Sequence, residues 1–560
     1  MQDVKKDIEK AVKDTCAEFG FPEANFVVER PADMSHGDYA TNVALALSKQ
    51  LGKNPRDIAQ ELAQKLSERK TPSIEAIETA GAGFINFRLS RDYFAQTLKN
   101  ILADEKSFGK NDALAGKTVM VEYTQPNPFK PFHIGHLMSN TIGEALTRIF
   151  ESSGANVIRA NYQGDVGLHV AKALWGMMKK GVAPDDIPGI GEAYAYGHEM
   201  YETNEAAARE IVDLNKKVYA HDQEVEETYK KGRTATLDAF EKIYALLGTT
   251  FDEYFFESEV WEKGTALVEE GLQKNIFEKS DGAIIFPGEK HGLHTRVFIT
   301  KEGVPTYEAK ELGLAFLKTE RCNFDVSLTI TAVEQEQYFN VVFKALELLH
   351  PEFAGKFQHA HHGMMVLPSG KMSSRTGNVI TGESLIADMI ARAKEKVSER
   401  GVSDADKIAQ DVAVGAIKYM VLKQNLGKNI VFDAEKSLSF EGDSGPYLQY
   451  TYTRANSILE KARAEGIAPS TEKEVAISDL ERLCERFPEV VRGALEGRAP
   501  SDIVQYLISL SSEFNAWYAT GRIVDAQDAE SPYKVALTAA VAAILTSGLQ
   551  MTGIPAPSRM

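Results

Sequence analysis

The sequence predicts an α/β protein of several domains, and three observations support this prediction. Its 560 residues are about four times the length of a typical domain. From about residue 113, short apolar runs alternate with helical patterns, as they do in parallel α/β sheets. Beyond about residue 430, nearly every pattern is helical. We therefore expect three domains, at residues 1–112, 113–430 and 431–560.

The first domain is predicted to be a small α+β unit. Val4, Ile8 and Val12 fall on one stripe of an N-terminal helix. In the run GAGFINFRLS, Phe84, Asn86 and Arg88 alternate with Ile85 and Phe87, as in a strand. The turn residues of KNDALAGKTV then lead into a new apolar run, which places the boundary near residue 113.

The second domain is predicted to contain the parallel sheet. Its first units are a strand at 118–123, a proline-containing loop, a helix at 134–153 and a strand at 156–160. A long charged helical stretch over about 180–265 indicates an insertion. Strand patterns return at 283–286, 297–300 and 326–331, followed by a helix at 336–349, and we expect these strands to rebuild the interrupted sheet.

The third domain is predicted to be all helical. Its longest apolar run, residues 535–545, is too short to span a bilayer of roughly 30 Å and indicates a buried helix. The three cysteines, at positions 16, 322 and 484, lie far apart and are odd in number, which supports neither a disulfide framework nor a C-x-x-C zinc site. The N-terminus lacks the apolar core of a signal peptide. We expect a cytoplasmic protein with no membrane partner and no structural zinc.

The net charge of −17 argues, by itself, against a polyanionic partner. The sum of the charges does not give their placement, however, and a short basic path on an acidic body is sufficient to bind phosphates. If such a path exists, affinity for a polyanion should fall as the salt concentration rises.

The most specific motif is PNPFKPFHIGH, residues 126–136, which lies between a predicted strand and a predicted helix. A helix N-terminus at the carboxyl end of a parallel strand is a common phosphate site. His133 and His136 are three residues apart and are expected to face the same anion, with Lys130 as a nearby cation. Gly135 leaves room for a base to approach the backbone. The alternative is a helix start with two incidental histidines.

A second motif is the loop LPSGKMSSRTGN, residues 367–378. Lys371 and the hydroxyl group of Ser373 are suited to stabilising the charge that develops on departing pyrophosphate. The loop is not a P-loop, because Met372 stands where that motif requires Ser or Thr. Alone, it would be interpreted as an ordinary surface turn.

Together, PFHIGH and KMSSR resemble the HIGH and KMSKS signatures of class I aminoacyl-tRNA synthetases. VEYTQPNPFKPFHIGHLMSNTIGEAL, NYQGDVG, SFEGDSGPYLQYTYTRANSIL and IPAPSRM resemble the arginyl-tRNA synthetases, and this similarity extends over essentially the whole chain. One departure is Ser374, where KMSKS has its second lysine. In the arginyl family a lysine just before HIGH commonly compensates, and Lys130 stands in that place.

The resemblance implies ATP-dependent ligation of L-arginine to its tRNA through an arginyl-adenylate, with release of AMP and pyrophosphate. It implies a Rossmann-like catalytic domain with a helical insertion, an N-terminal domain that touches the tRNA elbow and a helical anticodon-binding domain. The substrates would be arginine, tRNA and ATP carrying Mg²⁺, and we expect a monomer. The implied catalytic residues are Lys130, His133, His136 and Lys371, and the implied ATP-binding residues are His133, Gly135, His136, Asp165, Lys371, Met372 and Ser373.

A guanidinium ligand requires carboxylates or amide oxygens in a fixed arrangement. By resemblance, Glu122 and Asn127 hold the amino acid, and Tyr307 and Glu311 lie four apart on one helical face. Glu311 replaces the usual Asp, which keeps the charge and adds a methylene. Gln335 completes the predicted arginine site. The alternatives are a solvated helix face for Glu311 and a core position for Tyr307.

Unstacked RNA bases are commonly held by aromatic rings and arginine planes. On that basis the predicted tRNA-binding residues are Tyr447, Tyr450, Arg454, Phe514 and Tyr518, at helical spacings in the third domain. The alternative is aromatic packing between helices, which the pattern favours for Phe514.

Three other functions remain open at this point. The absence of a zinc-type cysteine pair disfavours a class I synthetase for cysteine or glutamate. A small-molecule nucleotidyltransferase would not need the long helical third domain. An RNA-binding regulatory protein derived from a synthetase would not need the two histidines and Lys371.

Overall fold

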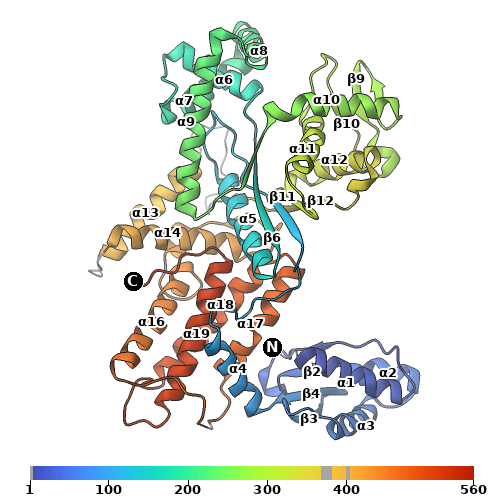
Figure 1. Cartoon of the computed structure of the whole chain (residues 1–560), viewed down its shortest axis with the longest axis vertical. Helices are drawn as coiled ribbons and strands as arrows, with labels where there is room; N and C mark the ends of the chain where they lie inside the picture. Colours follow the sequence, from blue (N-terminus) through green and yellow to red (C-terminus); the bar gives the residue numbers. More distant parts are fainter. Residues whose placement is uncertain (1–3, 367–380, 399–403, 474) are drawn as a thin grey trace. The chain divides into compact units, whose positions relative to one another are not determined.

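The computed structural model describes residues 4–366, 381–398, 404–473 and 475–560. The chain, drawn in Figure 1, divides into two compact units. The first unit comprises Met1–Phe108, Arg454–Pro488 and Ser509–Leu545, and the second comprises Gly109–Thr453, Glu489–Ile508 and Thr546–Met560. The three domain boundaries given by the sequence stay predictions.

The N-terminal part of the first unit is α+β. Its four strands form an antiparallel sheet in the order β1-β2-β4-β3. The predicted N-terminal helix is present, with Val4, Ile8 and Val12 buried on one stripe. The elements are α1 (Val4–Glu18), β1 (Val28–Glu29), β2 (Tyr39–Thr41), α2 (Val43–Leu51), α3 (Pro55–Glu68), β3 (Ile74–Ala80), β4 (Phe84–Leu89) and α4 (Arg91–Ala103).

A five-stranded parallel sheet organises the second unit. The strands are β5 (Thr118–Glu122), β6 (Asn156–Gln163), β7 (Glu253–Phe256), β11 (Val326–Ala332) and β12 (Phe357–His362). Their spatial order is β12-β11-β5-β6-β7. The order reverses at β5, and open α/β sheets bind nucleotides at the carboxyl ends of the strands beside such a reversal. Helix α5 (Ile134–Ser152) follows β5 and packs on the sheet (Figure 1).

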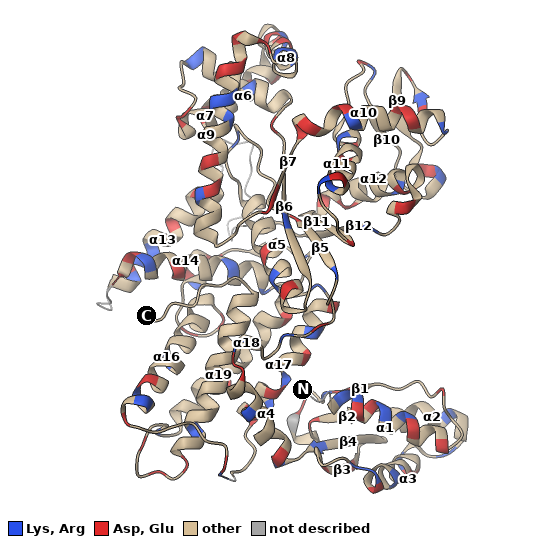
Figure 2. Cartoon of the chain, in the orientation of Figure 1, with Lys and Arg blue, Asp and Glu red and all other residues tan. Residues whose placement is uncertain are grey.

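The insertion consists of four helices between β6 and β7: α6 (Leu168–Lys180), α7 (Ile187–Thr203), α8 (Glu205–Tyr219) and α9 (Gln223–Leu247). Figure 2 shows acidic and basic residues interspersed along α8 and α9, as the charged sequence predicted. The apolar residues Leu174, Ile190 and Ile211 belong to a core that these helices share. The insertion therefore has a hydrophobic core distinct from that of the sheet.

The expectation that strands 283–286 and 297–300 rebuild the parallel sheet is wrong. They become β9 (Ala283–Phe286) and β10 (Arg296–Ile299), which join β8 (Glu278–Ser280) in a separate antiparallel sheet. The parallel sheet is completed instead by β7 and β12, for which no strand was predicted. Local periodicity indicates a strand, but the hydrogen-bond partner of that strand depends on distant parts of the chain.

One face of the parallel sheet is covered by α10 (Glu257–Gln273), α11 (Tyr307–Arg321) and α12 (Glu336–Leu349). Met120 of β5 and Ala160 of β6 point into the core beneath these helices. Side chains two residues apart on a strand share a face, so Glu122 and Tyr162 point to the same side. The sheet therefore directs a glutamate and a tyrosine towards α10–α12 at its carboxyl edge.

The remainder of the chain is mostly helical. The further helices are α13 (Gly382–Ser398), α14 (Ala405–Leu422), α15 (Ala434–Ser437), α16 (Gly445–Ala464), α17 (Asp479–Glu496), α18 (Pro500–Ala519) and α19 (Ser531–Met551), and the short strands β13 (Met365–Val366) and β14 (Ile430–Val431) pair with each other. Helix α19 is long and apolar enough to cross a membrane, but 83% of its most apolar window is buried. Such burial is typical of a core helix, as predicted for residues 535–545.

Candidate active site

The two histidines of the first motif form the N-terminus of α5. His133 is the N-cap residue, and its Nδ1 accepts a hydrogen bond from the backbone N–H of His136 at 3.3 Å. The Nδ1 of His136 accepts one from the backbone N–H of His133 at 3.1 Å. The two rings stack with their centroids 3.4 Å apart. This reciprocal capping holds both rings at the end of the helix where N–H groups favour an anion.

The capping also determines where the histidine protons lie. Desolvation, reinforced by the charge of Lys130, lowers the pKa of His133 to about 4. Desolvation and the neighbouring His133 hold the pKa of His136 well below its ordinary value. Both rings are therefore neutral at pH 7, and because each Nδ1 is an acceptor, each proton lies on Nε2. Each ring can donate an Nε2–H hydrogen bond to a phosphate oxygen.

The requirement for glycine at position 135 has a more local explanation than the predicted approach of a base. A Cβ atom at this position would lie 2.9 Å from Cε1 of His133, so any side chain would collide with the stacked ring. Lys130 is half-buried, with its Nζ 5.3 Å from the ring centroid of Tyr194 on α7. Burial lowers the pKa of Lys130, while Glu257 acts in the opposite direction.

The second motif cannot be placed beside the first. Lys371, Met372, Ser373 and the rest of residues 367–380 lie outside the described residues. The chain re-enters the described part at Thr381, which forms an isolated β-bridge with His133. The segment that follows the second motif therefore begins beside the first motif.

Three carboxylates lie close together under α10–α12: Glu122 at the end of β5, Glu257 at the start of α10, and Glu311 on α11. We call this group the carboxylate cluster. Lys310 binds Glu257, with Nζ 2.6 Å from Oε2, and Lys318 forms an ion pair with Glu122. Glu311 has no hydrogen bond or ion pair to any described residue. When all three carboxylates are ionised, the two lysines leave one excess negative charge, the charge that a guanidinium group neutralises.

The surroundings of Glu311 oppose its ionisation. Desolvation, and then the charge of Glu122, raise its pKa to about 8. A partly buried carboxylate without a partner is costly unless it is protonated or meets a cation. Glu311 is therefore mostly neutral at pH 7 and becomes charged when a cation arrives.

The other predicted arginine-site residues differ in their surroundings. Asn127 accepts a hydrogen bond from the backbone N–H of Gly164 at 2.8 Å, which ties the loop after β5 to the end of β6. Tyr307 begins α11, four residues before Glu311, and is 57% exposed. Gln335 is exposed in a 3-10 turn after β11. Of the charged groups that act on Tyr338, on the next helix, Glu311 acts most strongly.

Asp165 is committed to contacts within the chain. Its carboxylate accepts hydrogen bonds from Nε of Arg233 at 2.9 Å and from the backbone N–H and hydroxyl of Ser258 at 2.9 and 2.8 Å. The side chain is 1% exposed. These contacts join the end of β6 to α9 and α10, and the role of Asp165 in binding ATP stays a prediction.

Sequence reasoning did not include Glu257, Lys310, Lys318 or Tyr162. Glu257 follows β7, a strand that was not predicted, so its place at the carboxyl edge of the sheet was hidden. Lys318 stands seven residues after Glu311 on the same helical face, and this spacing was the one available signal. The partners of these residues come from elements far apart in the chain.

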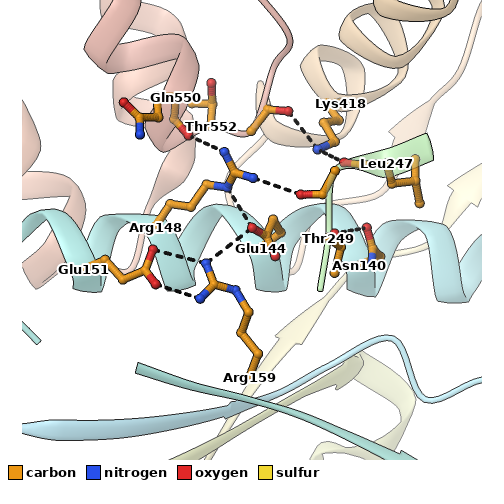
Figure 3. Close-up of polar contacts among 12 residues, drawn as sticks. Asn140, Glu144, Arg148, Glu151, Arg159, Leu247, Thr249, Lys418, Gln550 and Thr552 are labelled. Carbon is orange, nitrogen blue, oxygen red and sulfur yellow. Dashed lines mark hydrogen bonds and ion pairs between the residues drawn. The ribbon is translucent and has the colours of Figure 1, made fainter. Parts of the chain in front are cut away.

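A polar network holds the far end of α5 (Figure 3). Arg148 pairs with Glu144 at 2.7 Å and donates to the carbonyl groups of Gly248 and Gln550 at 2.9 and 3.1 Å. Lys418 of α14 donates to the carbonyl groups of Leu247 and Gly553 at 2.6 and 2.7 Å. The C-terminal segment therefore fixes the helix that presents both histidines.

The predicted tRNA-binding aromatics separate into two groups. Phe514 is fully buried and packs beside Trp517, so the prediction that it stacks on a base is wrong, and core packing explains its helical spacing. Tyr518 is 40% exposed, and the Arg454 guanidinium lies 5.1 Å from its ring centroid. Tyr447 and Tyr450 are partly buried on α16.

A parallel sheet of this order, with paired histidines capping the helix after its first strand, defines a class I aminoacyl-tRNA synthetase catalytic domain. A family model described as the class I (R) tRNA synthetase catalytic domain matches residues 97–434. Models of the arginyl tRNA synthetase N terminal domain and the DALR anticodon binding domain match residues 2–89 and 448–560. The chain belongs to the arginyl-tRNA synthetase family.

Relatives of full length agree with this assignment. An arginine–tRNA ligase of Bacillus cereus is 32% identical over 545 residues, which cover 95% of each chain. One from Clostridioides difficile is 30% identical over the whole of both chains. The structure of the arginyl-tRNA synthetase of Thermus thermophilus superposes with a TM-score of 0.82 at 26% identity, covering 99% of this chain and all of that one. As a member of this family, the chain is an enzyme that uses ATP to attach arginine to its tRNA.

Proposed function

We propose that the carboxyl edge of the parallel sheet activates arginine between the paired histidines and the carboxylate cluster. The observation that carries this proposal is the unpaired Glu311, because it leaves the cluster one cation short when ionised. The first motif is within electrostatic reach of this cluster, since the charge of Glu257 acts on Lys130. The guanidinium group would bind Glu311, and Glu122 and Asn127 would orient the rest of the amino acid. Tyr307 and Gln335 stay proposed members of the site.

The first step joins arginine to AMP. A carboxylate oxygen of arginine attacks the α-phosphorus of ATP, and the bond from that phosphorus to the pyrophosphate oxygen breaks. The Nε2–H groups of His133 and His136 donate to phosphate oxygens as negative charge develops there. Lys130 and Lys371 neutralise departing pyrophosphate, together with the Mg²⁺ that ATP carries. The histidines transfer no proton, and no protein nucleophile is required.

In the second step, a terminal ribose hydroxyl of tRNA takes the arginyl group and AMP leaves. Tyr447, Tyr450, Arg454 and Tyr518 are the proposed anticodon-side contacts. Stacking favours exposed rings, so Tyr518 with its neighbouring Arg454 is the strongest of these. We further propose the domain boundaries stated above, a monomeric state and a cytoplasmic location.

A groove on the N-terminal domain extends the proposed tRNA contacts. It runs along α1, and Val27 on its wall is 51% exposed. Its lining combines positive charge with apolar surface, which suits an RNA backbone. The lining residues are Lys5, Lys6, Glu9, Lys10, Lys13, Phe26, Val27 and Val28.

The experiment that tests the proposed function offers the purified protein each amino acid with ATP, with and without bulk tRNA. We expect ATP–pyrophosphate exchange and tRNA charging with arginine alone. Charging by another amino acid would contradict the proposed specificity. Binding of tRNA without any charging would favour a regulatory protein, and adenylate formation without transfer to tRNA would favour a small-molecule nucleotidyltransferase.

A further inference from the structure

Tyr162, on β6, has a buried hydroxyl group that no described residue uses. The oxygen atom is inaccessible to solvent and has no hydrogen-bond partner. Hydroxyl groups withdrawn from water in this way are uncommon, because each loses its hydrogen bonds to water and gains none. Such an unsatisfied group in a folded enzyme calls for an explanation.

The surroundings of this hydroxyl are the carboxylate cluster. The charged groups that act most strongly on Tyr162 are Glu257 and Glu311, with Glu122 acting more weakly. Tyr162 and Glu122 lie on the same face of neighbouring strands, since Glu122 is in register with Ala160, two residues before Tyr162. The unpartnered oxygen is therefore held among the groups that await the guanidinium.

The existing pairings leave Tyr162 available for a ligand. Glu257 is bound by Lys310, and Glu122 by Lys318. A guanidinium group carries five N–H donors, which is more than the unpaired Glu311 alone can satisfy. A phenol oxygen keeps a lone pair to accept an N–H even when its own hydrogen points at a carboxylate. The hydroxyl thus supplies an uncharged acceptor between charged ones.

We propose that Tyr162 is a specificity-determining residue whose hydroxyl oxygen accepts a hydrogen bond from the guanidinium group of arginine. This inference rests on the proposed placement of arginine at the carboxylate cluster. Lysine, with a compact ammonium group and three donors, cannot reach Glu311 and Tyr162 in the same planar arrangement. The hydroxyl therefore contributes to the choice of arginine over lysine.

The test is Tyr162→Phe, which removes only the hydroxyl. The KM for arginine in ATP–pyrophosphate exchange should rise about ten-fold, as expected for a lost hydrogen bond to a charged group, with little change in kcat or in the KM for ATP. The melting temperature without arginine should not fall, because the hydroxyl has no bond to lose. The increase in melting temperature on adding arginine should shrink.

The matched control is Tyr244→Phe on α9. The hydroxyl of Tyr244 is also buried, but it accepts a hydrogen bond from Asn161 at 3.1 Å. This variant should lose stability and keep its KM for arginine, the opposite of Tyr162→Phe. A Tyr162→Phe enzyme with an unchanged KM for arginine would overturn the inference. So would a raised KM accompanied by a lower melting temperature and a raised KM for ATP, since that result indicates a structural role.

The wild-type enzyme separates this inference from the proposed function. If the wild type fails to activate arginine, the proposed function is wrong and this inference fails with it. If the wild type activates arginine and Tyr162→Phe has the same KM for arginine as the wild type, only the role of Tyr162 is refuted.

Discussion

Arginine binding should release a proton from Glu311. The carboxyl group has a pKa of about 8 in the free protein, so at pH 7 about ten protonated molecules exist for each ionised one. A guanidinium group binds the ionised form, which means that the proton must leave first. Below pH 8 the apparent affinity for arginine should therefore weaken about ten-fold for each unit of pH. The histidines add nothing to this dependence, because the pKa values of both lie well below this range.

Isothermal titration calorimetry measures this linkage directly. Titrations at pH 7 in two buffers with different ionisation enthalpies should show release of about 0.9 proton per arginine bound. Glu311→Gln serves as the control, since it keeps the shape of the side chain but cannot ionise. The variant should bind arginine more weakly and show no such pH dependence. The α-amino group of arginine contributes equally for the wild type and for Glu311→Gln. The difference in proton release between the two proteins therefore comes from Glu311.

The same raised pKa has a consequence for stability. The folded protein holds a proton on Glu311 that the unfolded chain has already released, so unliganded stability should fall as pH rises from about 4.5 through about 8. Glu311→Gln should be more stable than the wild type at pH 8.5 without arginine. An arginine affinity that is independent of pH between 6.5 and 8.5 in the wild type, with identical heats in both buffers, would refute this reasoning.

Three further predictions concern catalysis, stability and RNA binding. His136→Ala should slow adenylate formation by about 10²-fold or more while changing the affinity for ATP only a few-fold, as measured by pyrophosphate exchange and equilibrium binding. Arg148→Met should lower the free energy of unfolding by ~3 kcal/mol, measured by urea denaturation, because one carboxylate and two carbonyl groups each lose one hydrogen-bond donor. Lys10→Glu combined with Lys13→Glu should weaken tRNA binding and flatten its log–log salt dependence by about 2, since two phosphate contacts are lost.

Each of these predictions has a contradicting result, and the last two also have a matched control variant. An unchanged rate of adenylate formation in His136→Ala would exclude a contact between the His136 ring and the phosphates of ATP. Arg392 also pairs with an acid four residues away, but it is 52% exposed, so Arg392→Met should cost less than about 1 kcal/mol. Equal losses in the two arginine variants would contradict the importance of the network in Figure 3. Lys49 lies on α2, outside the groove. If Lys49→Glu weakened tRNA binding as much as the double groove variant, the groove would be excluded as a tRNA contact.

Much of the fold was predictable because its signals are local. The α5 helix begins at Ile134 and ends at Ser152, close to the predicted 134–153. Both end signals are local, because the capping His133 directly precedes the helix and Gly154 follows just beyond its end. The α12 helix matches the prediction at both ends. The strands at 283–286 and 297–300 were placed correctly along the chain and incorrectly in space. Their pairing is decided by backbone groups far away in the sequence, which periodicity cannot identify.

The sequence by itself determined the family, the two motifs, and the position of the paired histidines at a helix N-terminus. The tertiary structure decided which charges meet. Glu122, Glu257 and Glu311 come from β5, α10 and α11, which are far apart in the sequence. Only folding brings two lysines to two of these carboxylates and leaves the third unpaired. Burial likewise removed Phe514 from the surface and enclosed the hydroxyl of Tyr162. Charge pairing and desolvation act through space, so the chain order alone does not reveal them.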